Sequence, residues 1–141
     1  MKNYNLFVYG SLREGFYNYE KYLKGKVLKN TPAVLHNMEL YHMPYKGYPA
    51  ILEGRGEVYG EIVEVSDYDA TVKAIDDMEN FISENNPANE YHKKLLEVEH
   101  LENGKKEMCY VYFYNKDIDK VFNEEAIHIP EGSWKNYMTN K

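Results

Sequence analysis

The 141-residue chain has a single cysteine, no basic run longer than a pair of residues and no long apolar stretch. One cysteine cannot form an intramolecular disulfide, which favours the reducing cytoplasm. A net charge of −6 without a basic cluster argues against nucleic-acid binding. No segment approaches the ~20 apolar residues that span a bilayer, and the N-terminus lacks the apolar core of a secretory signal. We therefore expect a cytoplasmic protein with no nucleic acid and no membrane among its partners.

Signatures of several kinds of catalytic chemistry are also missing. The five histidines form no i,i+4 pair and have no cysteine partner at zinc spacing. Ser11 lies in no Gly-x-Ser-x-Gly elbow, and Gly10 and Gly15 match neither a Walker loop nor a dinucleotide fingerprint. Cys109 falls in the middle of an apolar strand, where a structural thiol is expected rather than a nucleophile. We expect no metal, no cofactor and no covalent nucleophile.

The abundant residue is tyrosine, with 15 copies against five phenylalanines and one tryptophan. Tyrosine suits a pleated, half-buried surface with a wet edge, so the enrichment favours a β-rich protein. The length, the ordinary hydrophobic content and the well-mixed charge indicate one folded domain over residues 1–141. The sequence leaves the oligomeric state open.

Apolar runs predict strands at 6–8, 33–41, 50–52 and 58–65, with a weaker one at 27–28. Asn30-Thr31-Pro32 and the glycine-containing segment 53–56 are expected to interrupt them. A helix is expected to start at Ser66, which can cap it, with Asp69 in a capping-box-like position.

A hairpin is expected after residue 94. The strands 95–102 and 105–114 flank Asn103-Gly104, a strong signal for a two-residue type I′ turn. This turn would pair Val98 with Cys109 and Leu96 with Val111, and it would place Cys109 and Val111 on one apolar face.

The segment 6–23 combines a buried strand, a glycine turn at Gly10 and a short helix over 16–23. Such a turn exposes several unpaired backbone N–H groups at one point, where a carboxylate or phosphate can bind. The alternative interpretation is an ordinary connection between a strand and a helix.

Glu79 breaks an otherwise regular pattern. Tyr68, Val72 and Ile75 repeat at helical spacing, and the next position on that stripe is this glutamate. Burial, the negative end of the helix dipole and Asp76 one turn earlier would each raise the pKa of its carboxyl group toward the range of a proton shuttle. The alternative interpretation is a side chain that reaches solvent at a fraying helix end.

Several of these residues also form an ordered set of motifs. In chain order the set is Tyr9-Gly10-Ser11-Leu12 with Gly15 and Asn18, Tyr48-Pro49-Ala50, Val58-Tyr59-Gly60-Glu61, Asp76-Asp77-Met78-Glu79, Tyr91 and Gly132-Ser133-Trp134. The set resembles the gamma-glutamylcyclotransferase-like family over residues 4 to 134. The form Tyr-Gly-Ser-Leu-Arg-Glu-Gly is most similar to the gamma-glutamylamine cyclotransferase branch and its bacterial relatives.

This resemblance implies an α+β protein, a compact mixed β-barrel with a few flanking helices. It also implies conversion of a gamma-glutamyl amine or gamma-glutamyl amino acid to 5-oxoproline, with release of the free amine. Glu79 matches the family's catalytic glutamate, and the loop Tyr9, Gly10, Ser11 and Leu12 matches the loop that holds the glutamyl group. Tyr112 and Tyr114, which end the hairpin, are further candidates for lining the pocket.

The chain departs from the family pattern in three places. Asn80 stands where glycine often follows the glutamate, Lys93 and Lys94 stand where an arginine is common, and Ser133 replaces an aspartate. These differences bear on substrate choice and local packing. Two other functions remain open: a non-catalytic small-molecule binding module on the same fold, and an interaction module that uses the tyrosine-rich strand face.

Overall fold

The computed structural model describes residues 3–13 and 15–139, in which five strands close into a barrel. Their order is β3, β1, β5, β4 and β2, and β2 pairs with β3 again. β1 runs parallel to β5 and all other pairs are antiparallel, so the predicted mixed barrel is confirmed. The strands are β1 (Leu6–Val8), β2 (Val27–Met43), β3 (Tyr48–Val65), β4 (Tyr91–His100) and β5 (Lys106–Tyr114), with the short β6 (Ile127–His128) added to the edge of β2.

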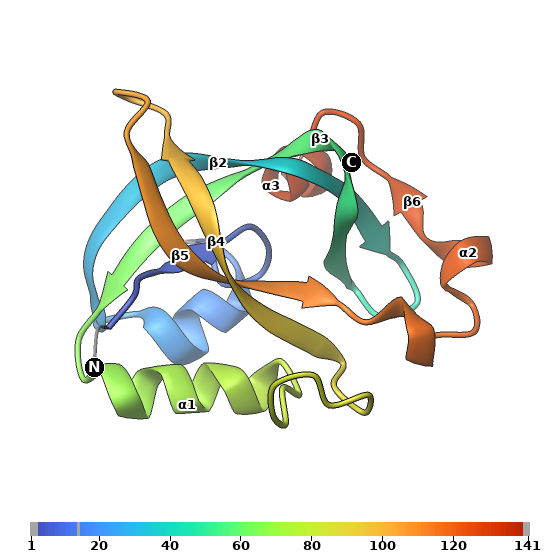
Figure 1. The fold of residues 1–141 in the computed structure, drawn as a ribbon, viewed down its shortest axis with the longest axis horizontal. Coiled ribbons are helices and arrows are strands. Elements are labelled where there is room, and N and C mark those ends of the chain that lie inside the picture. Colours follow the sequence, from blue (N-terminus) through green and yellow to red (C-terminus); the bar gives the residue numbers. More distant parts are fainter. Residues whose placement is uncertain (1–2, 14, 140–141) are drawn as a thin grey trace.

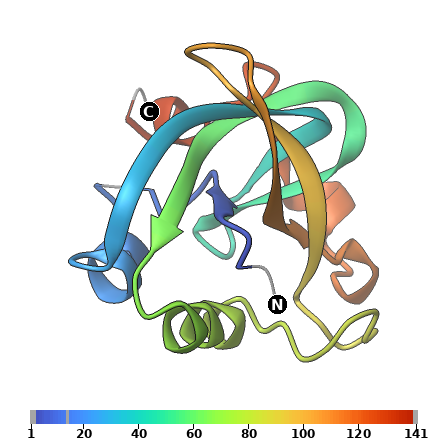
Figure 2. The ribbon, with the colours of Figure 1, turned by 60° about the vertical axis from the view of Figure 1, so that its left-hand side comes forward.

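The helices are short and lie outside the barrel. Figures 1 and 2 show α1 below the barrel with η1 beside it, while α2 and α3 lie elsewhere on its surface. Their bounds are η1 (Tyr19–Leu23, a π-helix), α1 (Tyr68–Met78), η2 (Lys116–Ile118, a 3₁₀ turn), α2 (Phe122–Glu125) and α3 (Trp134–Thr139). None of the helices in the described ranges has the length and apolarity that a membrane crossing needs.

β2 and β3 are longer than expected, because they pair continuously from Val27↔Val65 to Met43↔Tyr48. The predicted break at Asn30-Thr31-Pro32 is therefore wrong, since these residues pair with β3. Gly54 and Gly56, in the segment that was expected to interrupt the strands, also lie within β3. A Cβ at Gly54 would come within 2.2 Å of the Glu39 side chain, so glycine here lets a neighbouring side chain cross the strand.

The hairpin forms with a different register. Leu96 pairs with Cys109 and Val98 pairs with Glu107, two residues from the expected pairing. A type I′ turn needs positive φ at both central residues, but of Asn103 and Gly104 only the glycine has it (φ 70°). Because a two-residue shift preserves the alternation, Cys109 stays on the buried face as predicted.

Helix α1 begins differently from the prediction. Its N-cap is Asp67, and the Ser66 hydroxyl donates to the carbonyl of Lys26 at 3.3 Å instead of capping the helix. Val72 and Ile75 are buried, as their spacing predicts. The helix ends at Met78 with Glu79 as C-cap, and Asn80 follows in the left-handed region (φ 54°).

β1 is buried on both sides, which explains why the opening apolar run has no polar face. Leu6 and Val8 belong to the core beneath α1 and η1, whereas Phe7 and Tyr9 belong to a second core that includes Trp134. Successive residues of a strand point to opposite sides, so a strand between two cores is apolar throughout. The loop after β1 is thereby attached to the most deeply buried strand of the fold.

The C-terminal segment approaches β3 at Gly132, where the structure leaves no room for a side chain. Gly132 has φ 77°, and a Cβ there would lie 2.0 Å from the carbonyl oxygen of Glu57. We expect Gly132→Ala to lower the free energy of unfolding in urea by about 3 kcal/mol, because positive φ and a backbone clash add. Gly104→Ala is the control, since φ is also positive (70°) but the space is open; we expect about 1 kcal/mol there. Equal losses would contradict the clash.

Candidate active site

A cavity of about 250 Å³ lies between the loop after β1, helix η1 and the C-terminal end of α1. The starts of β3 and β4 complete its wall. Its lining includes the predicted residues Tyr9, Gly10, Ser11, Leu12, Glu79 and Tyr112, together with Asn18, Tyr48, Pro49, Asn80, Glu90 and Tyr91. The structure thus brings together motifs that are far apart in the sequence.

The loop 9–12 is held by its neighbours. A Cβ at Gly10 would lie 2.6 Å from Pro49 Cγ, so only glycine allows this close approach. The Asn18 amide donates to Ser11 Oγ at 2.6 Å, and Arg13 pairs with Glu61 at 3.1 Å. These contacts explain the spacing of the sequence motifs around the loop. Glu14, which belongs to the same motif, lies outside the described residues.

The loop leaves backbone donors available. The carbonyls of Gly10 and Ser11 accept hydrogen bonds from the amides of Arg13 and Tyr19, both at 3.0 Å. Within residues 3–13 and 15–139, nothing accepts a hydrogen bond from the amides of Gly10, Ser11 or Leu12. Because these residues line the cavity, their N–H groups can serve an anionic group bound there.

Glu79 lines the same cavity and is only partly exposed. No other described residue forms a hydrogen bond or ion pair with its carboxyl group. Burial, followed by the charges of Glu90 and Asp76, raises the pKa of Glu79 from 4.5 to about 8. The predicted burial and the effect of Asp76 are present, and Glu90 adds a contribution that sequence reasoning missed.

Asp76 is held by a cation and a phenol. Lys93 Nζ donates to its two carboxylate oxygens at 3.0 and 3.3 Å, and the Tyr112 hydroxyl donates to one of them. Lys93 also lies over the ring of Tyr110, with its Nζ 4.5 Å from the ring centroid. Lys93 thus forms an ion pair with the carboxylate of Asp76, one turn before Glu79 on α1.

Glu90 is the second charged neighbour. Its carboxylate accepts hydrogen bonds from the Tyr48 hydroxyl, from Lys46 Nζ at 3.1 Å and from the Asn80 amide at 2.8 Å. Although burial opposes it, this set of donors lowers the pKa of Glu90 below its usual value. The sequence around Glu90 did not indicate its role, because Lys46 and Tyr48 lie more than 40 residues earlier in the chain and Asn80 lies ten residues earlier.

The tyrosines of the site differ in placement. The Tyr9 hydroxyl donates to the carbonyl of Tyr112 at 2.6 Å, which connects the residue after β1 to β5 within the core. The Leu12 side chain packs in the core that also contains Leu6 and Val8. Tyr114 does not line the cavity; its hydroxyl donates to Asp119 at 2.6 Å and its ring stacks on Phe122.

The described residues give little support for metal-dependent or thiol chemistry. No three histidine, cysteine, aspartate or glutamate side chains in residues 3–13 and 15–139 are grouped as metal ligands. Cys109 is fully buried, and burial raises the pKa of its thiol to about 12. It is therefore a poor nucleophile near neutral pH. The fold thus forms a small barrel with a cavity whose lining includes the carboxyl groups of Glu79 and Glu90.

The chain belongs to a known family. The model of the family described as gamma-glutamyl cyclotransferase, AIG2-like, matches residues 6–136. A curated relative in Niallia circulans, the gamma-L-glutamyl-butirosin B gamma-glutamyl cyclotransferase, is 32% identical over 133 residues, which cover 94% of this chain and 76% of that protein. A Methanocaldococcus jannaschii protein with a provisional gamma-glutamylcyclotransferase name is 30% identical over 134 residues, covering 94% and 96%. The family and these relatives indicate gamma-glutamyl cyclotransferase activity.

Solved structures show the same fold. An AIG2-like protein from Mus musculus matches with a TM-score of 0.61 and 24% identity, covering 93% of this chain and 87% of that one. An uncharacterized protein from Pyrococcus horikoshii matches with a TM-score of 0.63 and 22% identity, covering 97% and 94%. The predicted family and fold are confirmed.

The raised pKa of Glu79 predicts how stability changes with pH. The folded state binds the proton more tightly than the unfolded chain, so this contribution is fully present below about pH 4.5 and is lost as the pH rises to about 8. Urea unfolding should therefore find Glu79→Gln more stable than the native chain above pH 8, by roughly 2–4 kcal/mol, and equal to it at low pH. Glu84→Gln, in an exposed part of the loop, should show no such trend. A pH-independent difference for Glu79→Gln would contradict the assignment.

Proposed function

We propose that the protein cyclises gamma-glutamyl amines or gamma-glutamyl amino acids to 5-oxoproline and releases the free amine, with Glu79 as general acid and base. The observation that carries the proposal is the state of this carboxyl group. It lies in the cavity without a hydrogen-bond partner among the described residues, and its pKa of about 8 suits proton exchange near neutral pH.

The loop 9–12 is proposed to hold the glutamyl group. The unused N–H groups of Gly10, Ser11 and Leu12 can bind its α-carboxylate without a charged side chain. The contacts of Gly10 with Pro49 and of Ser11 with Asn18 keep the loop in position before substrate arrives. Binding then spends little energy on ordering the site.

In the proposed reaction, Glu79 takes a proton from the substrate's α-amino group, whose nitrogen attacks the γ-carbonyl carbon of the same molecule. A five-membered ring closes, and the carbonyl oxygen becomes an oxyanion that backbone N–H groups near the loop can stabilise. Collapse of this intermediate breaks the bond to the leaving nitrogen, to which Glu79 returns the proton. Because the attack is intramolecular, the protein mainly selects one folded conformer of the substrate.

A panel of gamma-glutamyl amines and amino acids tests this function through release of 5-oxoproline. We expect turnover by the native chain and a loss of about a thousandfold in kcat for Glu79→Gln, since the amide cannot exchange the proton. Glu84→Gln should keep native activity. Saturable binding without turnover by the native chain would instead favour a small-molecule binding module, and the absence of any binding would favour an interaction module.

The pH profile tests the role of Glu79 as base. Because the ionised form must accept the proton, kcat/KM should rise with pH along a limb near the pKa of about 8. Asp76→Asn removes a neighbouring negative charge, so it should move this limb to lower pH, by roughly one unit. Asp69→Asn, exposed at the other end of α1, is the matched control. A limb that stays in place in Asp76→Asn would contradict the electrostatic explanation.

A further inference from the structure

A second concavity begins where the catalytic cavity ends. This outer groove, with a volume of about 710 Å³, shares Tyr48, Asn80 and Glu90 with the cavity. Its remaining wall comes from the end of α1, the segment after it and η2. A substrate whose glutamyl part occupies the cavity and whose remainder passes Glu90 would therefore extend into this groove.

We propose that the outer groove binds the leaving amine, and that Glu90 and Asp77 select amines that carry positive charge over amines that carry a carboxylate. The inference rests on the proposed cyclisation, since it concerns the part of the substrate that the reaction releases.

Glu90 stands at the boundary as a fixed anion. Three donors hold its carboxylate, from Tyr48, Lys46 and Asn80, and its side chain is 14% exposed. An ionised carboxylate has about four acceptor positions, so one remains for a further donor. The leaving N–H group or a nearby ammonium can use that position, whereas a carboxylate there would face repulsion.

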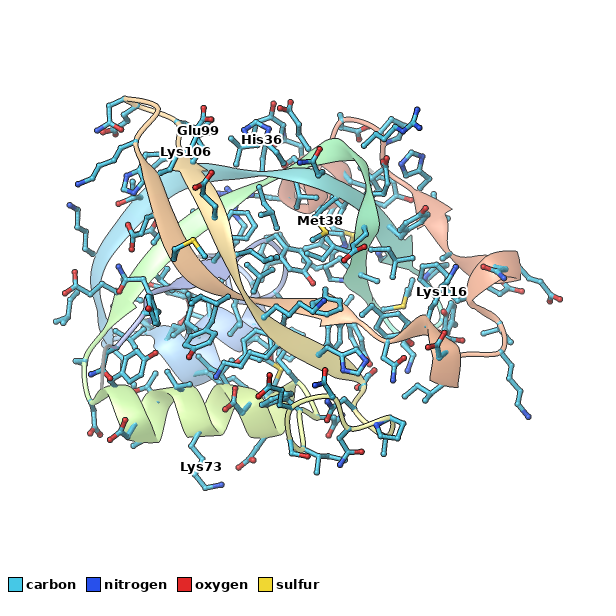
Figure 3. All side chains as sticks on the ribbon, viewed as in Figure 1. His36, Met38, Lys73, Glu99, Lys106 and Lys116 are labelled. Atoms are coloured by element: carbon cyan, nitrogen blue, oxygen red, sulfur yellow. The ribbon has the colours of Figure 1, made fainter. Side chains whose placement is uncertain are left out.

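The balance of charge in the groove is negative. Its one lysine, Lys46, is already paired with Glu90. Asp77 is 69% exposed, and its ion-pair partner Lys73 lies one turn earlier on α1 at 3.3 Å. Figure 3 shows the Lys73 side chain extending outward below α1, away from the barrel. Asp77 can therefore attract a cationic group at the far end of a bound amine.

Between the two carboxylates the groove is apolar. Phe81, Ile82 and Ile118 line it, and Ile82 and Ile118 are 62% and 49% exposed. Exposed apolar side chains next to fixed charges suit a molecule with an aliphatic chain and a charged end. The favoured substrate class is thus the gamma-glutamyl derivative of an aliphatic diamine or similar cationic alkylamine.

Two matched sets of substrates test the contributions of Glu90 and Asp77 to selectivity separately. Gamma-glutamyl-ethylamine and gamma-glutamyl-alanine differ by one carboxylate beside the leaving nitrogen, which would lie near Glu90. The gamma-glutamyl amides of 1,5-diaminopentane, pentylamine and 6-aminohexanoate share a five-carbon chain and differ in the charge of its end, which would lie near Asp77. For the native chain we expect kcat/KM to fall from the cationic to the neutral to the anionic end, by about fivefold or more between the cationic and the anionic end. We expect a fall of about fivefold or more from the ethylamine to the alanine derivative.

The variants are evaluated by ratios of kcat/KM between matched substrates. Removing the charge of Glu90 also alters the proton affinity of Glu79, but that effect is common to both substrates and cancels in the ratio. Glu90→Gln should reduce the ethylamine-to-alanine ratio by about fivefold, and Asp77→Asn should reduce the diamine-to-aminohexanoate ratio by a similar factor. Raising the salt concentration should weaken the Asp77 effect more, because Asp77 is the more exposed group. Glu84→Gln and Asp69→Asn should keep the native ratios.

Unchanged ratios in both variants, or equal kcat/KM for all substrates of a set, would overturn the proposal while leaving the cyclisation intact. If the native chain releases no 5-oxoproline from any substrate, the proposed function fails instead. Calorimetric affinities of the same compounds then test the groove, and equal affinities for cationic and anionic compounds would reject charge selection. Should Glu90→Gln fail to fold, the exposed Asp77→Asn variant still provides the distal comparison.

Discussion

Glu79 and Glu90 line one cavity with Asp76 beside Glu79, and the described residues donate hydrogen bonds to only two of these three carboxyl groups. Asp76 accepts hydrogen bonds from Lys93 and Tyr112, while Glu90 accepts hydrogen bonds from Lys46, Tyr48 and Asn80. Glu79 lies beside both with no such donor among the described residues, so burial and two negative neighbours favour its protonated form. The proposed chemistry depends on this unequal distribution of hydrogen bonds, since a proton shuttle needs a carboxyl group that gains and loses its proton near neutral pH.

The abundance of tyrosine has a physical explanation in this arrangement. A tyrosine packs its ring in a core and still donates a hydrogen bond at the edge of that core. Tyr48 and Tyr112 serve carboxylates in this way, and Tyr9 and Tyr91 donate to backbone carbonyls of Tyr112 and Pro49. The barrel can therefore place apolar rings around the carboxylates of Asp76 and Glu90 and still supply each of them with a hydrogen-bond donor.

The loop after β1 illustrates how the fold prepares a site before ligand binds. β1 is buried between two cores, and a Cβ at Gly60 would lie 2.2 Å from the carbonyl oxygen of Val8, so only glycine at this position lets β3 approach β1 so closely. Asn18 donates to Ser11 and also lies 3.7 Å from the sulfur of Met78, which links the loop to the end of α1 next to Glu79. The loop with the backbone donors and the helix end next to the proposed proton shuttle are thereby connected through one side chain.

Local pattern was sufficient for several features of this chain. The opening strand, the buried stripe of α1, the buried face of the hairpin and the position of Glu79 follow from residue types at fixed spacing, and the ordered motifs indicated the family and the barrel. Local pattern failed where distant segments meet. The strand through Pro32, the hairpin register, the shared donors of Glu90 and the packing of Tyr114 on Phe122 away from the cavity all depend on contacts between residues far apart in the chain. Periodicity reports which side of an element is buried, but the partner that a side chain meets there is set by how the barrel closes, and no stretch of sequence contains that information.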